Sequence, residues 1–243
     1  MANKKPVVLL HFGRPDSGKS YEMEVQAERA YKNKMRETIF VFNSGRDTDW
    51  QGYAEIELSS IKKTEELQFT YKKNVYNFSE SFMKLFKGKK VKARRTKDAR
   101  TKHLLFIEMS ERGYAGTFFI VDDAIAIIGT RLTFGQNACF FGAKHGDVWL
   151  GIVFHEPNQF PIGAWGALTM AKFFISNVKP AKSKADRIPH FNKMMSFYNI
   201  LREAPQYSFC GLDMNTGDAI YTPYKKVSKR KPKSKSKPKP KTK

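Results

Sequence analysis

The feature that most constrains this chain is a glycine-rich segment that follows a short apolar run near the N-terminus. Residues 7–12 read VVLLHF, a run that suits a central strand of a parallel sheet buried on both faces. Residues 13–20 read GRPDSGKS, which fits the pattern G-x-x-x-x-G-K-[ST]. Residues 20–34 then carry good helix formers without Pro or Gly. The order of strand, glycine-rich loop and helix predicts a phosphate-binding loop.

Each fixed position of this pattern has a chemical reason. Glycines let the backbone wrap around phosphate groups, and successive N–H groups at a helix N-terminus point at negative charge. We expect Lys19 to reach the β- and γ-phosphates and the Ser20 hydroxyl to ligate Mg²⁺. The predicted nucleotide-binding residues are Gly13, Arg14, Pro15, Asp16, Ser17, Gly18, Lys19, Ser20 and Tyr21. ATP and Mg²⁺ are therefore the expected cofactors, and Lys19 is also a catalytic candidate.

A second apolar run ends in two acids about 100 residues downstream of this loop. Residues 117–121 read TFFIV and are followed by Asp122 and Asp123. An acid at the end of such a strand holds the metal of a bound nucleotide, so we assign Asp122 to Mg²⁺. Asp123 is then the candidate that orients or deprotonates the attacking water. The competing interpretation is that the two acids only cap a helix, which we expect to run to about residue 137.

A fourth apolar run, residues 148–154, ends at His155. Ligands of open α/β sheets bind beyond the carboxyl ends of the strands, so His155 is expected to face the γ-phosphate from a neighbouring strand. We predict that it senses the phosphate. A purely structural histidine is the alternative.

Further apolar runs alternate with helical stretches. The expected strands are residues 38–42, 54–58 at an edge of the sheet, and 171–176. The expected helices are residues 66–86, 104–111 and 187–203, and residues 206–212 are expected to pair with 219–221 as a hairpin. This alternation predicts an α/β fold, a P-loop NTPase with a mostly parallel sheet and helices on both faces. We expect one domain over residues 1–224.

The charge of the chain points to a polyanionic partner. The sequence has 44 Lys and Arg against 23 Asp and Glu, a net charge of +21. In residues 225–243, 11 of 19 residues are Lys or Arg interleaved with Pro and Ser, which predicts a disordered tail that binds nucleic-acid phosphates nonspecifically. The alternatives are a solubilising tail or one that binds acidic protein partners. Residues 87–102 are expected to form a basic loop that either contacts DNA or is a solvated face. Its basic residues are Lys87, Lys89, Lys90, Lys92, Arg94, Arg95, Lys97, Arg100 and Lys102.

Other classes of protein find little support in the sequence. No uncharged apolar stretch reaches about 18 residues, so we expect a soluble protein without a transmembrane segment. Two cysteines and five histidines form no zinc-ligand spacing. A nucleophile elbow for Ser/His/Asp chemistry is also missing from the sequence.

Taken together, three features resemble the FtsK and HerA superfamily of DNA-pumping ATPases over about residues 6–176. They are the GRPDSGKS loop, the strand that ends at Asp122 and Asp123, and the sequence AKHGD at residues 143–147 before the fourth apolar run. Within this superfamily the chain resembles the compact genome-packaging ATPases of membrane-containing viruses and, next, the Zot-like assembly ATPases of filamentous phages. The resemblance implies an ATP-driven DNA translocase that forms a homo-oligomeric ring, a hexamer or pentamer. It also implies the host-cell cytoplasm or a virion vertex as its location, with the capsid or portal as a partner.

The resemblance extends to a residue that acts on the neighbouring subunit's nucleotide. Members of the superfamily typically place an arginine just before the fourth strand and a glutamine at its end. Lys144 and His155 occupy these places here, and Asp123 replaces the usual Glu. Lysine supplies charge without the two-pronged contact of guanidinium, so Arg131 and Arg187 are further candidates for the trans-acting residue.

Three alternatives to a packaging motor remain open at this point. A Zot-like assembly or export ATPase is one, although such proteins commonly carry a membrane span. A nucleotide-gated nucleic-acid-binding switch with little turnover is the second, against which the intact loop and acid pair argue. A small-molecule kinase is the third, for which the basic tail would have no explanation.

Overall fold

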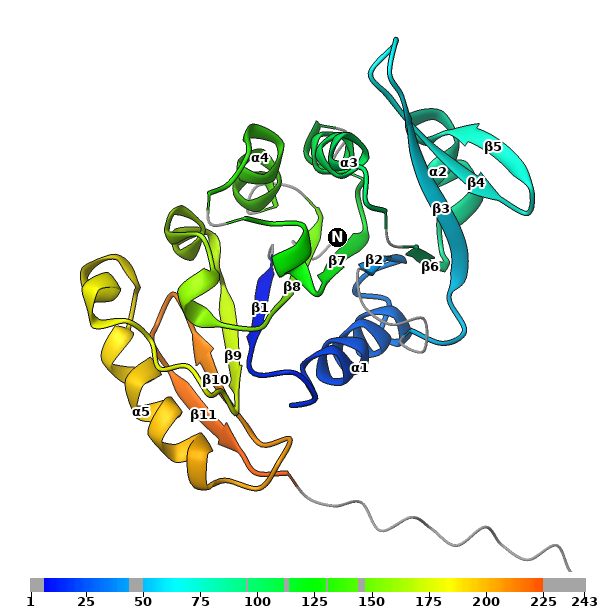
Figure 1. The fold of residues 1–243 in the computed structure, drawn as a ribbon. Coiled ribbons are helices and arrows are strands. Elements are labelled where there is room, and N and C mark those ends of the chain that lie inside the picture. Colours follow the sequence, from blue (N-terminus) through cyan, green and yellow to red (C-terminus); the bar gives the residue numbers. More distant parts are fainter. Residues whose placement is uncertain are drawn as a thin grey trace, which may run out of the picture.

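The computed structural model describes residues 7–43, 50–94, 96–111, 114–129, 131–143 and 147–224. Within these residues the centre of the molecule is an eleven-stranded sheet with the order β11-β10-β9-β1-β8-β7-β2-β6-β3-β4-β5 (Figure 1). The strands are β1 (Val8–Phe12), β2 (Thr38–Asn43), β3 (Ala54–Ile61), β4 (Glu66–Tyr71), β5 (Asn74–Asn77), β6 (Lys90–Ala93), β7 (Thr117–Asp122), β8 (Trp149–Phe154), β9 (Met170–Phe174), β10 (Phe209–Asp213) and β11 (Ala219–Thr222).

Nine helical segments connect or flank these strands in the described part of the chain. The α-helices are α1 (Lys19–Lys32), α2 (Phe78–Phe86), α3 (Ala99–Glu111), α4 (Phe134–Gly142) and α5 (Phe191–Glu203). The short 3-10 helices are η1 (Ala124–Ala126), η2 (Pro157–Gln159), η3 (Ile162–Ala167) and η4 (Lys182–Arg187). None of these helices is both long enough and apolar enough to cross a membrane.

The middle of the sheet is parallel and its two margins are antiparallel. All strands from β9 through β1, β8, β7, β2 and β6 to β3 run in one direction. Antiparallel strands follow β3 at one margin and β9 at the other. Every residue of β1 is buried between β8 and β9, as the uninterrupted apolar run predicts. The expected α/β fold with a mostly parallel sheet is therefore confirmed.

Helices cover both faces of this sheet, which is also as predicted. On one face α1 buries Met23, Ala27 and Ala30 against a cluster that includes Phe118 and Val153. On the other face a larger core joins the sheet to α2, α3, α4 and α5. Figure 1 shows α3 and α4 on the side of the sheet opposite to α1. Because α1 packs directly on the central strands, its contact with the sheet fixes the position of the loop that precedes it.

The expected helix over residues 66–86 is wrong in its first half. Residues of β4 alternate in burial, with Leu67 and Phe69 inward, and only α2 is helical. A two-residue turn joins β4 to β5, and its residues Lys72 and Lys73 have φ values of 49° and 70°. Two-residue hairpin turns of this kind usually carry Asn-Gly or Asp-Gly. The sequence analysis therefore missed this hairpin, because its turn is formed by Lys72 and Lys73.

Three other local expectations need correction. Residues 87–102 are not a continuous loop, because they contain β6 and the start of α3, where Asp98 accepts a hydrogen bond from the backbone of Thr101 at 3.1 Å. The strand expected at an edge, β3, lies between β6 and β4. The helix expected to follow Asp123 is a short η1, and α4 begins only after a capping box of Thr133 and Gln136.

The expected hairpin near the C-terminus is confirmed. β10 pairs antiparallel with β11 and places Cys210 opposite Tyr221. β10 also pairs with β9, so the hairpin extends the sheet beside the strand next to β1. Residues 225–243 lie outside the described residues, so the disordered tail and the division at residue 224 stay predictions.

The close packing of α1 on β8 gives a first test. Gly151 has no room for a side chain, because an added Cβ would lie 2.8 Å from Met23 Sδ and 2.9 Å from Phe118 Cε2. We expect Gly151→Ala to lower the free energy of unfolding by about 1–3 kcal/mol, as overpacked cores do. Equilibrium urea denaturation followed by circular dichroism measures this.

Gly211→Ala is the matched control, since Gly211 also lies in an inner strand. The nearest atom to its added Cβ is 3.9 Å away. We expect its free energy of unfolding to stay within about 0.5 kcal/mol of the unaltered protein. If Gly151→Ala and Gly211→Ala lowered the free energy of unfolding equally, the explanation by close packing would be wrong.

Candidate functional site

The GRPDSGKS loop, residues 13–20, follows the carboxyl end of β1 and leads into α1. A Cβ added to Gly13 would lie 2.7 Å from Phe174 Cβ, so only glycine lets the loop approach β9 this closely. The backbone N–H of Arg14 donates to the Ile175 carbonyl at 2.9 Å. Gly18 is the N-cap of α1 with φ 92°, a conformation that favours glycine. Gly13 therefore permits close packing against β9, and Gly18 permits a left-handed backbone conformation at the start of α1.

Lys19 lies inside this loop with its charge poorly solvated. Its side chain donates from Nζ to the Arg14 carbonyl at 2.7 Å, and the residue is 4% exposed. Burial lowers the Lys19 pKa to about 8, although the carboxylates of Asp122, Asp123 and Asp16 oppose this shift. The buried Ser17 Oγ has no hydrogen-bond partner among the described residues. A buried ammonium and a free hydroxyl in one loop are the groups that a phosphate ligand would satisfy.

Ser20 and Asp122 meet although they are 102 residues apart. Ser20 Oγ donates to Asp122 Oδ1 at 2.8 Å, and Trp50 Nε1 donates to Asp122 Oδ2 at 2.8 Å. Asp122 is 2% exposed, so both of its oxygens are fixed in a buried position. This pair suits Mg²⁺, which is usually bound through one or two carboxylates, substrate phosphates and water. No group of three or more His, Cys, Asp or Glu that could form an all-protein metal cage occurs among the described residues.

Asp123 and His155 form a second polar pair at the same edge of the sheet. His155 Nε2 lies 2.9 Å from Asp123 Oδ1, and each side chain is 31% exposed. They follow the neighbouring parallel strands β7 and β8, which explains why they meet. Asp123 has φ 51°, a strained conformation for a non-glycine residue. Such strain is common at functional sites, and here it occurs at the residue whose carboxylate contacts His155.

His11 lies directly beneath the loop, where the sequence analysis assigned it no role. Its ring is 1% exposed, and Nδ1 contacts the Lys19 carbonyl at 3.1 Å. Burial, together with the positive charge of Lys172, lowers the His11 pKa to about 3. The imidazole is therefore neutral at physiological pH and donates to the first turn of α1. A neutral donor supports the loop without adding a further positive charge.

Comparisons with known proteins identify the fold. The sequence matches no protein-family profile and no curated protein. The structure aligns with the genome packaging NTPase B204 from Sulfolobus turreted icosahedral virus 2 in complex with AMPPCP, at TM-score 0.63 and 16% identity over 91% of this chain and 99% of that one. B204 from Sulfolobus turreted icosahedral virus, a DNA-packaging ATPase, aligns at 0.58 and 13% over 91% and 100%. VirB4 of Thermoanaerobacter pseudethanolicus aligns at 0.52 and 7% over 90% and 89%.

The chain has a P-loop NTPase-like fold, which it shares with B204. At these identities the likeness establishes the fold alone, so the roles of individual residues rest on the geometry of the site. That geometry brings Lys19, Ser20, Asp122, Asp123 and His155 to one edge of the sheet. The site residues were predicted from separate sequence runs, and the parallel topology of this fold is the reason that they converge.

Two of the candidates for a trans-acting residue, Arg131 and Arg187, are not part of that cluster. Arg131 is exposed between η1 and α4, and Arg187 is exposed at the end of η4. Lys144 lies outside the described residues. Trp50 is a site residue that the sequence analysis missed, because a single tryptophan in a turn-rich stretch carries no motif.

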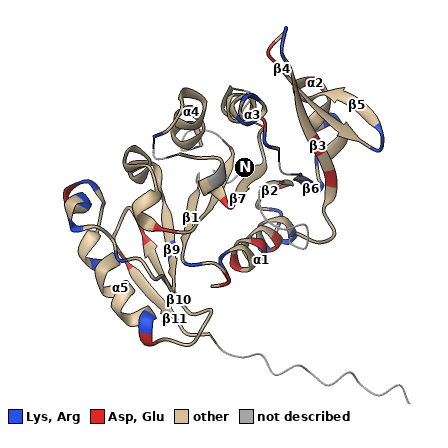
Figure 2. Cartoon of the chain, in the orientation of Figure 1, with Lys and Arg blue, Asp and Glu red and all other residues tan. Residues whose placement is uncertain are grey.

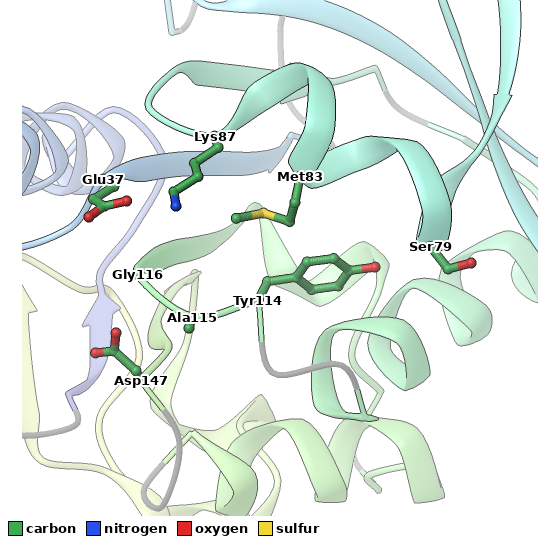
Figure 3. Close-up of a pocket in the computed structure, with 8 residues that line it drawn as sticks. All are labelled: Glu37, Ser79, Met83, Lys87, Tyr114, Ala115, Gly116 and Asp147. Carbon is green, nitrogen blue, oxygen red and sulfur yellow. The ribbon is translucent and has the colours of Figure 1, made fainter.

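A second hollow lies at the opposite edge of the sheet. It has a volume of about 740 Å³ and is lined by residues at the amino ends of β2 and β7, with Lys87 from the basic segment (Figure 3). Glu37 and Asp147 line it as well, so both signs of charge are present. Asp147 also forms an ion pair with the buried Arg36 at 2.8 Å.

The lowered pKa of Lys19 makes nucleotide binding depend on pH. A bound phosphate raises the Lys19 pKa, because an opposite charge favours the ammonium form. Binding at pH 8–9 should therefore take up protons, and the affinity should fall as pH rises through about 8. Calorimetric titration with ADP in buffers of different ionisation enthalpy measures both quantities.

Lys19→Arg is the control, because guanidinium keeps its proton throughout this range. Its ADP affinity, even if weaker, should change little between pH 7 and 9.5. An ADP affinity of the unaltered protein that is constant over the same interval would rule out a pKa of about 8 for Lys19.

Proposed function

We propose that this protein is an ATP-driven DNA translocase of the genome-packaging type. The observation that carries the proposal is the hydrogen bond from Ser20 to Asp122, which joins the phosphate-binding loop to the acid of the neighbouring nucleotide motif. A glycine turn without nucleotide function would need neither this hydrogen bond nor a buried lysine next to it. ATPase chemistry accounts for both.

The binding step uses the loop from Gly13 to Tyr21. Its backbone N–H groups and the N-terminus of α1 hold the phosphates, while Lys19 exchanges the Arg14 carbonyl for phosphate oxygens. Ser20 and Asp122 hold Mg²⁺, which supplies charge neutralisation at the phosphates when it is bound. Trp50 keeps the Asp122 carboxylate in one orientation during this step.

The hydrolytic step is assigned to Asp123 and His155. Asp123 stands beyond the carboxyl end of β7, where its carboxylate orients a water molecule and accepts its proton. His155 contacts the same carboxylate from the end of β8. A change in the position of His155 when the γ-phosphate leaves would therefore reach Asp123 directly. This contact gives His155 the sensor role.

DNA is the proposed polyanionic partner, and the tail is its main contact. In the segment at residues 87–102, four basic side chains form ion pairs with acids on other elements. The pairs are Lys90 with Glu28, Lys92 with Glu55, Arg94 with Glu55, and Arg100 with Glu65. Glu28 and Glu55 lie on α1 and β3, two elements that carry acidic positions in Figure 2, and Glu65 lies between β3 and β4. Since this pairing offsets part of the segment's charge, we assign more of the proposed DNA binding to residues 225–243.

We expect duplex DNA to raise the ATPase rate of the intact protein. Lys19→Ala should abolish hydrolysis, and Asp123→Asn should lower kcat by about 10²–10⁴-fold while ATP binding persists, because it removes only the proton acceptor. Truncation after Tyr224 should raise the DNA concentration for half-stimulation at least tenfold and flatten its salt dependence, since 11 basic residues are lost. A coupled phosphate-release assay at two salt concentrations measures these effects.

The basal rate of the truncated protein is the control, and it should equal that of the intact protein. Hydrolysis that is indifferent to DNA at every salt concentration would end the translocase proposal. Nucleotide binding without turnover would favour a nucleotide-gated switch, and phosphate transfer to a small acceptor would favour a kinase. DNA-independent hydrolysis would leave the Zot-like assembly ATPase as the better reading.

The proposed ring requires one subunit to complete its neighbour's site. Lys144, Arg131 and Arg187 are the candidates, and Ala variants of the responsible residue should lose most of the DNA-stimulated activity. Mixing that variant with the Lys19→Ala protein should restore part of the activity, because each supplies the group that the other lacks. ATPase assays across mixing ratios test this. The control is a mixture of Lys19→Ala and Asp123→Asn, which should not restore activity. If no candidate is restored by mixing, none of the three acts in trans.

A further inference from the structure

A cavity of about 600 Å³ adjoins the phosphate-binding loop on the side of the C-terminal hairpin. It begins at Gly18, Tyr21 and Glu22, which belong to the loop and the first turn of α1. Its other wall comes from β9, from the hairpin and from Tyr207 and Tyr224. Cavities of this size accommodate small-molecule ligands. No predicted site residue other than Gly18 and Tyr21 lines it.

Three tyrosines give this cavity an aromatic and accessible surface. Tyr21 is 72% exposed, and Tyr207 and Tyr224 are each 42% exposed. The rings of Tyr207 and Tyr224 lie 5.2 Å apart at an angle of 68°. Exposed rings that gather around one hollow usually mark a binding surface.

The aromatic wall is attached to the phosphate-binding loop. Gln206 Nε2 donates to the Asp16 carbonyl at 3.3 Å, and a Cβ added to Gly18 would lie 3.0 Å from Tyr207 Cδ1. The backbone N–H of Tyr224 donates to Ser208 Oγ at 2.9 Å. Tyr207 itself has φ 72°, a strained conformation that its surroundings maintain. The cavity is therefore a fixed continuation of the loop.

The position and chemistry of the cavity indicate its occupant. Phosphates held by the loop would be attached to a nucleoside, which needs space beside the loop, and this cavity adjoins the loop at Gly18 and Tyr21. Its side chains offer faces for stacking and few groups for hydrogen-bond recognition of a base. The one carboxylate of the lining, Glu22, forms an ion pair with Lys172. Stacking on aromatic side chains tolerates any base because every base has a π-face.

Building on the proposed ATPase function, we propose that Tyr207 and Tyr224 bind the nucleobase by stacking, and that the site discriminates weakly between adenine and guanine. The triphosphate then provides most of the selectivity of binding. The tyrosines act as binding residues for the base, and they have no part in the hydrolytic step.

Calorimetric titrations with AMPPCP, GMPPCP and inorganic triphosphate test this proposal. Tyr224→Ala should raise the Kd of AMPPCP about 5- to 100-fold and leave the Kd of triphosphate unchanged, because only the stacking contact is lost. Tyr207→Phe should retain the affinity, since it keeps the ring. AMPPCP and GMPPCP should bind the unaltered protein within about fivefold of each other.

Tyr221→Ala is the matched control, because Tyr221 is 44% exposed on the same hairpin and does not line the cavity. It should leave both affinities unchanged. Equal loss of AMPPCP and triphosphate binding in Tyr224→Ala, or a preference of AMPPCP over GMPPCP above about 50-fold, would overturn the inference. If AMPPCP and triphosphate bind the unaltered protein equally well, only this inference fails. If neither binds, the proposed ATPase function fails as well.

Discussion

The site depends on one constraint, the parallel pairing of β1 with β8 and β9. β8 and β9 come from residues more than 130 positions later in the chain, and each pairs with β1 in register. Because parallel strands end at the same edge, the loop after β1, the acids after β7 and the histidine after β8 meet there. Gly151 on β8 then lets α1 pack closely enough to present its N-terminus at that edge. Sheet topology thus converts distant sequence motifs into one site.

The charges of the side chains at this edge of the sheet partly offset one another. Lys19 is buried close to Asp16, Asp122 and Asp123, so its charge is partly offset before any ligand binds. His11 beneath it is neutral because burial and Lys172 oppose its protonation. A second charged group under the loop would have carried a large desolvation cost. The site therefore accommodates the buried ammonium group of Lys19, and most of the positive charge of the chain lies elsewhere.

The sequence was sufficient for the features that follow from fixed spacing and continuous apolar runs. The glycine loop, the buried strands and the acid pair fall in this class, since each is a local pattern with a local physical cause. Trp50 and Tyr207 do not, because each adopts a left-handed conformation and reaches its partner only through tertiary contacts. The β4–β5 hairpin was missed because Lys72 and Lys73 supply none of the usual turn chemistry. Sequence patterns thus led to the proposed phosphate side of the site, and the structure was needed for the proposed base side.

The C-terminal hairpin links the two parts of the molecule that would have to act together. β10 extends the sheet beside β9, and the chain then passes Tyr224, which lines the cavity next to Gly18. The basic sequence begins at the following residue, Lys225. A polyanion bound to this sequence is therefore tethered one residue from a wall of the nucleotide site. Closeness along the chain gives a physical route by which the proposed DNA binding and the proposed nucleotide binding would affect each other.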